Sequence, residues 1–130
     1  ATAVSEATGV PPDNLFVRGP GCDQCTSGLQ GRTVAAETVL TDAKLLLFFH
    51  EDRRADMRRY WIEQLRGRPM MFHALVKVGL GLVDVNEVEE EIDLVDSFLR
   101  SEPALAKLLP GAISQEREGM QRELLRGAAE

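Results

Sequence analysis

The chain has 130 residues, of which 44% are hydrophobic and 5% aromatic, and it carries a net charge of -6. This length fits one ordinary domain with at most a subdomain, and it excludes a complete nucleotide-driven motor. The negative charge argues against nucleic acid as a partner, and no apolar run approaches the roughly 18 to 20 residues of a membrane-spanning helix. Two cysteines are too few for a disulfide scaffold and favour a cytosolic setting.

The first 41 residues are rich in glycine and proline and predict a turn-rich β segment. Residues 4–8 fit a short helix, residues 14–18 a short strand, and residues 32–40 a longer strand rich in Val and Thr. Between the two strands, Cys22 and Cys25 are separated by two residues and flanked by glycines that permit a tight turn.

Helix-compatible sequence dominates after this segment. Asp42 is placed to cap a short helix that ends at His50, and the dense apolar cluster of that helix predicts burial. The next predicted helix covers residues 53–65, and its apolar side is formed by Met57, Tyr60, Trp61 and Leu65.

The following predicted helix, residues 70–83, is apolar nearly all round and needs cover on several sides. Asp84 and Glu87 resemble a capping box that opens a helix with an apolar stripe as far as Leu99. After residue 100, the sequence predicts a short helix that Pro110-Gly111 breaks, and a last helix over residues 114–126 with a thin apolar face.

Together these elements predict an α+β fold that is mostly α. A short N-terminal β segment with a Cys-x-x-Cys knuckle (1–41) precedes a compact helical subdomain (42–100) and a helical extension (101–130), and about five helices follow the β segment.

Cys22 and Cys25 have the spacing of two thiolate ligands of one tetrahedral zinc ion, and they supply half of such a site. The other soft donors, His50 and His73, lie on predicted helices with apolar neighbours. A reduced turn without metal and a dithiol redox pair are the alternatives. No Gly-x-x-x-x-Gly-Lys-Ser/Thr pattern occurs, and Gly79-Leu80-Gly81 fits a helix end, so we predict no active site in this chain.

Two charged surfaces are candidates for protein contacts. The 53–65 helix carries a basic cluster, and the helix that opens at Asp84 carries an acidic face. Either the basic cluster is a solvated face with internal ion pairs, such as Arg59 with Glu63, or it meets an acidic surface, for instance the acidic stripe of another copy. The candidate interaction residues are Arg53, Arg54, Arg58, Arg59, Glu89, Glu90 and Asp93.

Three motifs together resemble one known family. These are Gly21-Cys22-Asp23-Gln24-Cys25, the following Gly28-Leu29-Gln30-Gly31-Arg32-Thr33, and the later run from Arg66-Gly67-Arg68-Pro69-Met70 to Asp84-Val85-Asn86-Glu87-Val88. Over about residues 10–95 they resemble the C-terminal end of the secretion-type ATPases, which include the type II secretion and type IV pilus assembly ATPases.

The resemblance implies that ATP and magnesium bind in a core N-terminal to this chain, and that the whole protein is a hexamer on the cytoplasmic face of the inner membrane. This chain would then be a non-catalytic domain that packs on the ATPase core and contacts neighbouring subunits or the membrane platform. Cys22 and Cys25 would be two of four zinc ligands, with the other pair upstream. The alternatives are a stand-alone zinc-knuckle or helical adaptor protein, and an enzyme that uses the cysteines as a redox pair.

Overall fold

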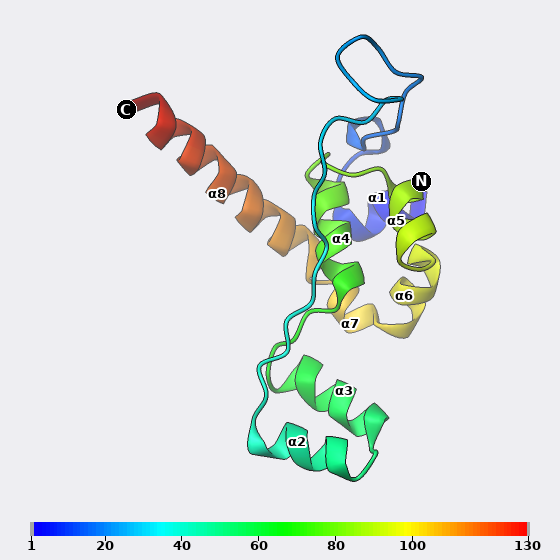
Figure 1. Cartoon of the computed structure of the whole chain (residues 1–130), viewed down its shortest axis with the longest axis vertical. Helices are drawn as coiled ribbons and strands as arrows, with labels where there is room; N and C mark the ends of the chain where they lie inside the picture. The colour runs from blue at the N-terminus through cyan, green and yellow to red at the C-terminus, as the bar shows by residue number, and fades with distance from the viewer. Residues whose placement is uncertain (1, 130) are drawn as a thin grey trace.

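The computed structural model describes residues 2–129, and they form a helical chain with long irregular connections (Figure 1). The elements, in chain order, are α1 (Thr2–Thr8), the 3-10 helix η1 (Pro12–Asn14), α2 (Ala43–His50), α3 (Arg54–Glu63), α4 (Met70–Gly79), α5 (Val85–Glu91), α6 (Val95–Ser101), α7 (Pro103–Ala106) and α8 (Leu109–Ala129).

The prediction of an α+β fold with an N-terminal β segment is wrong, because residues 2–129 contain no β-strand. Within this range, β-pairing is limited to one isolated bridge between Thr26 and Leu29. Residues 32–41 do run extended, but they lie along the helix α4 (Figure 1). A helix has already used its backbone groups internally and offers none for a β-ladder, so extended sequence with β-forming residues remains unpaired.

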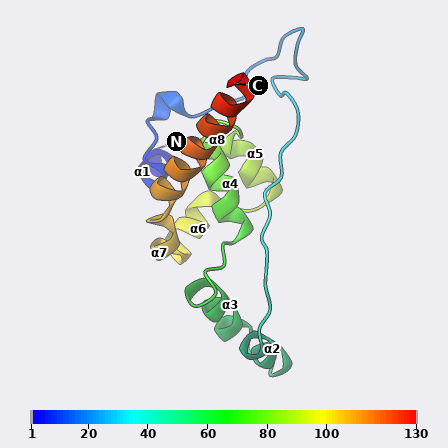
Figure 2. The same ribbon diagram turned by 90° about the vertical axis from the view of Figure 1, so that its left-hand side faces the viewer.

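The main core is built around α4. This agrees with the prediction that the apolar helix over residues 70–83 needs cover on several sides. Seven of its ten residues are buried, and α1, α5 and α8 pack against it (Figures 1 and 2). The largest fully buried side chains are Leu75 and Val78 of α4 and Leu109 of α8. The helix ends at Gly79, and Gly81 follows with a φ of 75°, which confirms the predicted stop.

The hairpin of α2 and α3 lies beyond the end of α4 that carries Met70 (Figure 1). Asp42 caps α2 as predicted, with its side chain accepting a 2.8 Å hydrogen bond from the Leu45 amide. The predicted burial of α2 is wrong, because Leu45 is its one buried residue. The helix packs mainly on α3, and two helices in contact leave most of a largely apolar helix uncovered, including Leu47 and Phe49.

Two helix boundaries also differ from those predicted. The single helix expected from Asp84 to Leu99 is broken into α5 and α6, and the Glu89 side chain accepts a hydrogen bond from the Val95 amide across the break. The last helix begins at Leu109 instead of residue 114. Pro110 is then in the first turn, where the missing N–H removes no internal hydrogen bond. α8 has 21 residues, and no helix within residues 2–129 is both long and apolar enough to cross a membrane.

Candidate functional site

The knuckle of residues 21–29 is shaped by two glycines with left-handed backbone. Gly21 has a φ of 104° and Gly28 a φ of 85°. A Cβ atom on Gly28 would lie 2.2 Å from the carbonyl oxygen of Gly19, so this position admits no larger residue without a shift of the backbone. The two glycines therefore permit the tight turn that the sequence predicted.

The turn brings the two sulfur atoms together. Cys22 Sγ and Cys25 Sγ are 3.4 Å apart, and Cys25 Sγ also accepts a hydrogen bond from the Cys22 amide at 3.0 Å. Hydrogen bonds from the Cys22 side chain, and then from the backbone of Cys22 and Gly28, lower the pKa of the Cys25 thiol below its ordinary value. The pair has the proximity that a shared metal ion or a disulfide requires.

The other ligands of a tetrahedral site are not brought to the knuckle. No group of three or more His, Cys, Asp and Glu side chains suitable for a metal occurs in the described part of the chain. His73 lies on α4, where its Nδ1 accepts a 2.9 Å hydrogen bond from the Ala36 amide, and His50 ends α2 beside Phe49. Cys22 and Cys25 are thus two donors in the described part of the chain, whereas a structural zinc site needs four.

Arg18 ties the knuckle to the helical core, and sequence reasoning missed this residue. Its Nε donates to the Ser27 carbonyl at 2.7 Å, its backbone amide donates to Asp84 Oδ2 at 2.9 Å, and its guanidinium pairs with Glu87 Oε1 at 2.9 Å. The sequence signal nearest to this contact was the capping-box pattern of Asp84 and Glu87. It correctly identified Asp84 as the cap of α5, but Glu87 is engaged by Arg18.

The basic cluster on α3 is neutralised within the chain. Arg53 pairs with Glu51 and Asp56 at 3.1 and 3.0 Å, and Arg59 also meets Asp56, at 3.9 Å, where the sequence predicted Glu63. The remaining two pairs are Arg54 with Asp52 at 3.1 Å and Arg58 with Glu102 at 3.4 Å. All four arginines are exposed, which is the arrangement of a solvated face with internal ion pairs.

The acidic candidate residues are different, because Glu89, Glu90 and Asp93 form no ion pair with another described residue, whereas Glu87 and Asp96 of the same stretch pair with Arg18 and Arg100. Glu89 and Glu90 are exposed on α5, and Asp93 follows in the break before α6. Glu89 and Asp93 accept backbone hydrogen bonds from Val95 and Leu94, which leaves their charges uncompensated. A basic partner could pair directly with these carboxylates. An acidic partner of α3 would have to replace the ion pairs that its arginines already form.

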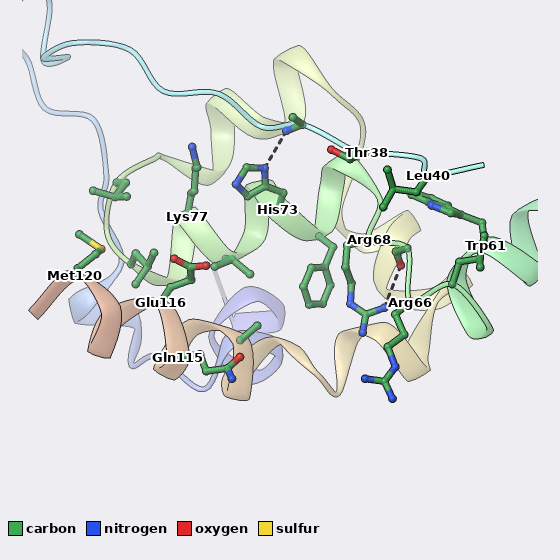
Figure 3. Close-up of a pocket in the computed structure, with 18 residues that line it drawn as sticks. Thr38, Leu40, Trp61, Arg66, Arg68, His73, Lys77, Gln115, Glu116 and Met120 are labelled. Carbon is green, nitrogen blue, oxygen red and sulfur yellow. Dashed lines mark hydrogen bonds between the residues drawn. The ribbon is translucent and has the colours of Figure 1, made fainter. Parts of the chain in front are cut away.

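A groove opens between the extended segment 32–41, α4 and α8 (Figure 3). Its volume is about 770 Å³. Thr38 and Leu40 form one rim, Glu116 and Met120 of α8 form the other, and α4 forms the floor. Trp61, Arg66 and Arg68 lie at the end nearest α3.

Groups of α4 hold the extended segment in place. The Ala36 amide donates to His73 Nδ1 at 2.9 Å, and the Met70 amide donates to Glu37 Oε2 at 3.0 Å. The Lys77 ammonium donates to the Thr33 hydroxyl and the Val34 carbonyl. The segment nevertheless remains open to solvent, with Val34 67% and Leu40 80% exposed.

Comparison of the chain with family models, with curated proteins and with solved structures gave no match. The geometry therefore carries the functional argument. It provides a thiol pair on a tethered knuckle, an extended segment held along α4, and apolar side chains that the described residues leave exposed.

Proposed function

We propose that this chain is the non-catalytic C-terminal domain of a hexameric ATPase that powers type IV pilus assembly or type II secretion at the cytoplasmic face of the inner membrane. The motifs around Cys22 and Cys25, and the run from Arg66 to Val88, support this proposal through their resemblance to that family. ATP and magnesium would bind in the core of the parent protein, and this chain would contribute contact surfaces.

The observation that carries the proposal is the amount of apolar surface that the chain does not cover. Leu46, Leu47 and Phe49 of α2 are 45%, 53% and 67% exposed, and Leu40, which precedes α2 in the chain, is 80% exposed. Large apolar side chains that gather exposed on one short helix favour a surface that another protein covers. A domain that packs on an ATPase core or on a neighbouring subunit would bury such a patch.

In this proposal the knuckle is half of a zinc site. Cys22 and Cys25 would supply two thiolates, and a second cysteine pair upstream of the chain would supply the other two. The 3.4 Å separation of the sulfur atoms and the lowered pKa of Cys25 suit this role, because thiolates are the metal-binding form. We expect the isolated chain to hold no zinc tightly and the parent protein to hold one zinc per subunit.

The reading frame upstream of Ala1 tests the proposal directly. A Gly-x-x-x-x-Gly-Lys-Ser/Thr pattern within a few hundred residues, with ATP hydrolysis by the full-length protein and none by the isolated chain, is the expected result. A start codon close to Ala1 would reject it and favour the stand-alone adaptor.

Substitution of the exposed face of α2 tests the contact role. In the full-length protein, Phe49→Ser should weaken hexamer formation and ATP hydrolysis while the isolated variant melts within a few degrees of the wild type. Leu124→Ser, an equally exposed position on α8, is the matched control and should leave both unchanged. Equal effects of the two variants would contradict a specific role for α2.

A further inference from the structure

The two sulfur atoms of the knuckle are in contact and not bonded to each other. Cys22 Sγ and Cys25 Sγ are 3.4 Å apart, and both residues are free thiols. A disulfide bond is about 2.05 Å long, so the sulfur atoms need to approach each other by only about 1.4 Å to form one. The folded chain therefore already has nearly the geometry of an intramolecular disulfide.

The backbone of the knuckle keeps the two thiols at this distance. The Cys25 amide donates a 3.3 Å hydrogen bond to the Cys22 carbonyl, which closes the turn between the cysteines. Thr26 and Leu29 exchange two backbone hydrogen bonds, at 2.8 and 3.0 Å, which close the next turn, and Arg18 ties this turn to α5. Because this geometry exists before any bond forms, each thiol has a high effective concentration at the other.

The thiol pair is open to small reagents in solution. Cys22 is exposed and Cys25 is half-buried. Figures 1 and 2 show the knuckle within a loop that projects from the helical body. Exposed thiols are oxidised far more readily than thiols buried in a core. A low-molecular-weight disulfide can therefore reach this pair.

We propose that Cys22 and Cys25 are a reversible modification site, at which a low-molecular-weight disulfide such as oxidised glutathione converts the thiol pair into an intramolecular disulfide. The thiolate of one cysteine attacks a sulfur atom of the reagent, forms a mixed disulfide and releases one glutathione thiolate. The thiolate of the second cysteine then attacks the protein sulfur of the mixed disulfide, and the second glutathione thiolate leaves. Two protein thiols are thus oxidised, one glutathione disulfide is reduced, and the two released thiolates take up the two protons that the cysteines lost.

This modification goes beyond the proposed function and would limit it. Zinc binds to thiolates, so an oxidised pair offers neither of its sulfur atoms to a metal ion. The knuckle would then bind metal only in its reduced form. The oxidation itself needs neither a metal nor an upstream cysteine pair, so it is tested on this chain alone, and its failure leaves the proposed function intact.

Redox titration of the chain tests the proposal. The chain is equilibrated at a fixed concentration of reduced glutathione and rising concentrations of oxidised glutathione, quenched with acid and analysed by mass spectrometry. We expect a product that is lighter than the reduced chain by two hydrogen atoms, with less than about 10% as the mixed glutathione adduct. Cys22→Ser and Cys25→Ser, which lack the second thiol, should instead accumulate the adduct. A mixed adduct as the main product of the wild type would overturn the proposal.

The unfolded chain is the reference for the effect of the fold. We expect the folded chain to be half oxidised at about tenfold less oxidised glutathione than the same chain in concentrated urea. By thermodynamic linkage, this tenfold difference makes the oxidised chain about 1.4 kcal/mol more stable to unfolding than the reduced chain. Equal midpoints for the folded and unfolded chains would show that the knuckle does not prepare the pair for oxidation.

Two glycine substitutions form a matched pair of variants. Gly28 and Gly31 both have left-handed backbone, with φ of 85° and 74°. A Cβ atom on Gly28 would lie 2.2 Å from the Gly19 carbonyl oxygen, whereas nothing lies within 4 Å of one on Gly31. Gly28→Ala should therefore shift the knuckle and raise the oxidised-glutathione midpoint about tenfold, whereas Gly31→Ala should change it less than about twofold.

Melting curves of the two reduced variants will show that both fold. A midpoint for Gly28→Ala that stays with those of Gly31→Ala and the wild type would contradict the role of the knuckle geometry in the oxidation.

Discussion

The backbone amide of Arg18 donates a 2.9 Å hydrogen bond to Oδ2 of Asp84, a carboxylate 66 residues further along the chain that is 3% exposed. Oδ1 of the same carboxylate caps α5 by accepting a hydrogen bond from the Asn86 amide at 2.9 Å. One side chain thus both begins a helix and anchors the segment that leads into the knuckle.

Asp84→Ala should therefore lower the free energy of unfolding by about 2 to 3 kcal/mol. Loss of a helix cap costs about 1 kcal/mol, and an unsatisfied hydrogen-bond partner costs about another 1 to 2 kcal/mol. Urea unfolding of the isolated chain measures the change. Asp84→Asn, which retains one acceptor oxygen, should lose less. Asp96→Ala, at an exposed site in α6, should change stability by no more than about 0.5 kcal/mol. Equal losses of unfolding free energy for Asp84→Ala and Asp96→Ala would contradict the combined role of Asp84 as helix cap and as anchor of Arg18.

Gly67→Ala should destabilise the region around α3. A Cβ atom at this position would lie 2.2 Å from Cε2 of Trp61, whose ring is buried and rigid, so the backbone has to move. Overpacking of this kind typically costs about 1 to 3 kcal/mol. The matched control is Gly119→Ala in α8, where nothing lies within 4 Å and alanine should stabilise the helix by about 0.5 to 1 kcal/mol. Chemical denaturation of both variants should give changes of opposite sign.

The hydrogen bond between Tyr60 and Asp42 should make stability depend on pH at both ends of the scale. Tyr60 Oη donates to Asp42 Oδ2 at 2.5 Å. The bond from Tyr60, followed by that from the Leu45 amide, lowers the pKa of Asp42, whereas the bond to Asp42 raises the pKa of Tyr60. The contribution of Asp42 to the folding stability is present above its unfolded pKa of about 3.9. It is lost as the pH falls through the lower pKa of the folded state. The contribution of Tyr60 is present below about pH 10 and is lost as the pH rises through its raised folded value.

Tyr60→Phe tests this dependence, because it removes the phenol and keeps the ring. Below about pH 4 and above about pH 10, we expect the denaturation midpoint of the variant to vary less with pH than that of the wild type. Near neutral pH the variant should be less stable than the wild type. Identical pH profiles for the two proteins would falsify the assignment of this pair.

The two thiols should differ in reactivity because Cys25 is the acceptor of the pair. Its lowered pKa has the Cys22 side chain as the largest cause, so Cys22→Ala should raise the pKa of Cys25 and shift its alkylation by iodoacetamide to higher pH. Cys22→Ser is the control, since a hydroxyl still donates to the sulfur and should keep most of the effect. Rates measured from about pH 6 to pH 10 by mass spectrometry resolve the shift. A pH profile for Cys22→Ala that coincides with the wild type would disprove the hydrogen-bond explanation.

The helical part of the fold was predictable because the signals for it are local. Asp42, Asp84 and Gly81 mark helix ends through chemistry within one turn, and the apolar run of α4 indicates burial without reference to a partner. The extended conformation of residues 32–40 was also readable from its Val and Thr content. The sequence did not show whether this segment pairs with another strand. A β-strand needs a second strand beside it, and α4 lies there instead.

The candidate site was less predictable, for the same reason. The thiol pair follows from its spacing in the sequence, and the structure brings both sulfur atoms to 3.4 Å. The tether by Arg18 depends on contacts with residues 9 to 69 positions away, and no short motif contains that information. Burial of α2 was wrongly predicted because hydrophobic content shows that a helix needs cover, and does not show whether the same chain provides it.

The exposed outer part of α8 has a consequence for experiments on any assembly. Every residue from 114 to 129 is exposed, and at about 1.5 Å per residue this part of the helix extends roughly 24 Å (Figure 1). A fluorophore attached near Gly127 would be carried away from the core at the end of a helical arm. Its signal would therefore be insensitive to unfolding of the knuckle and would respond to the approach of a neighbouring molecule.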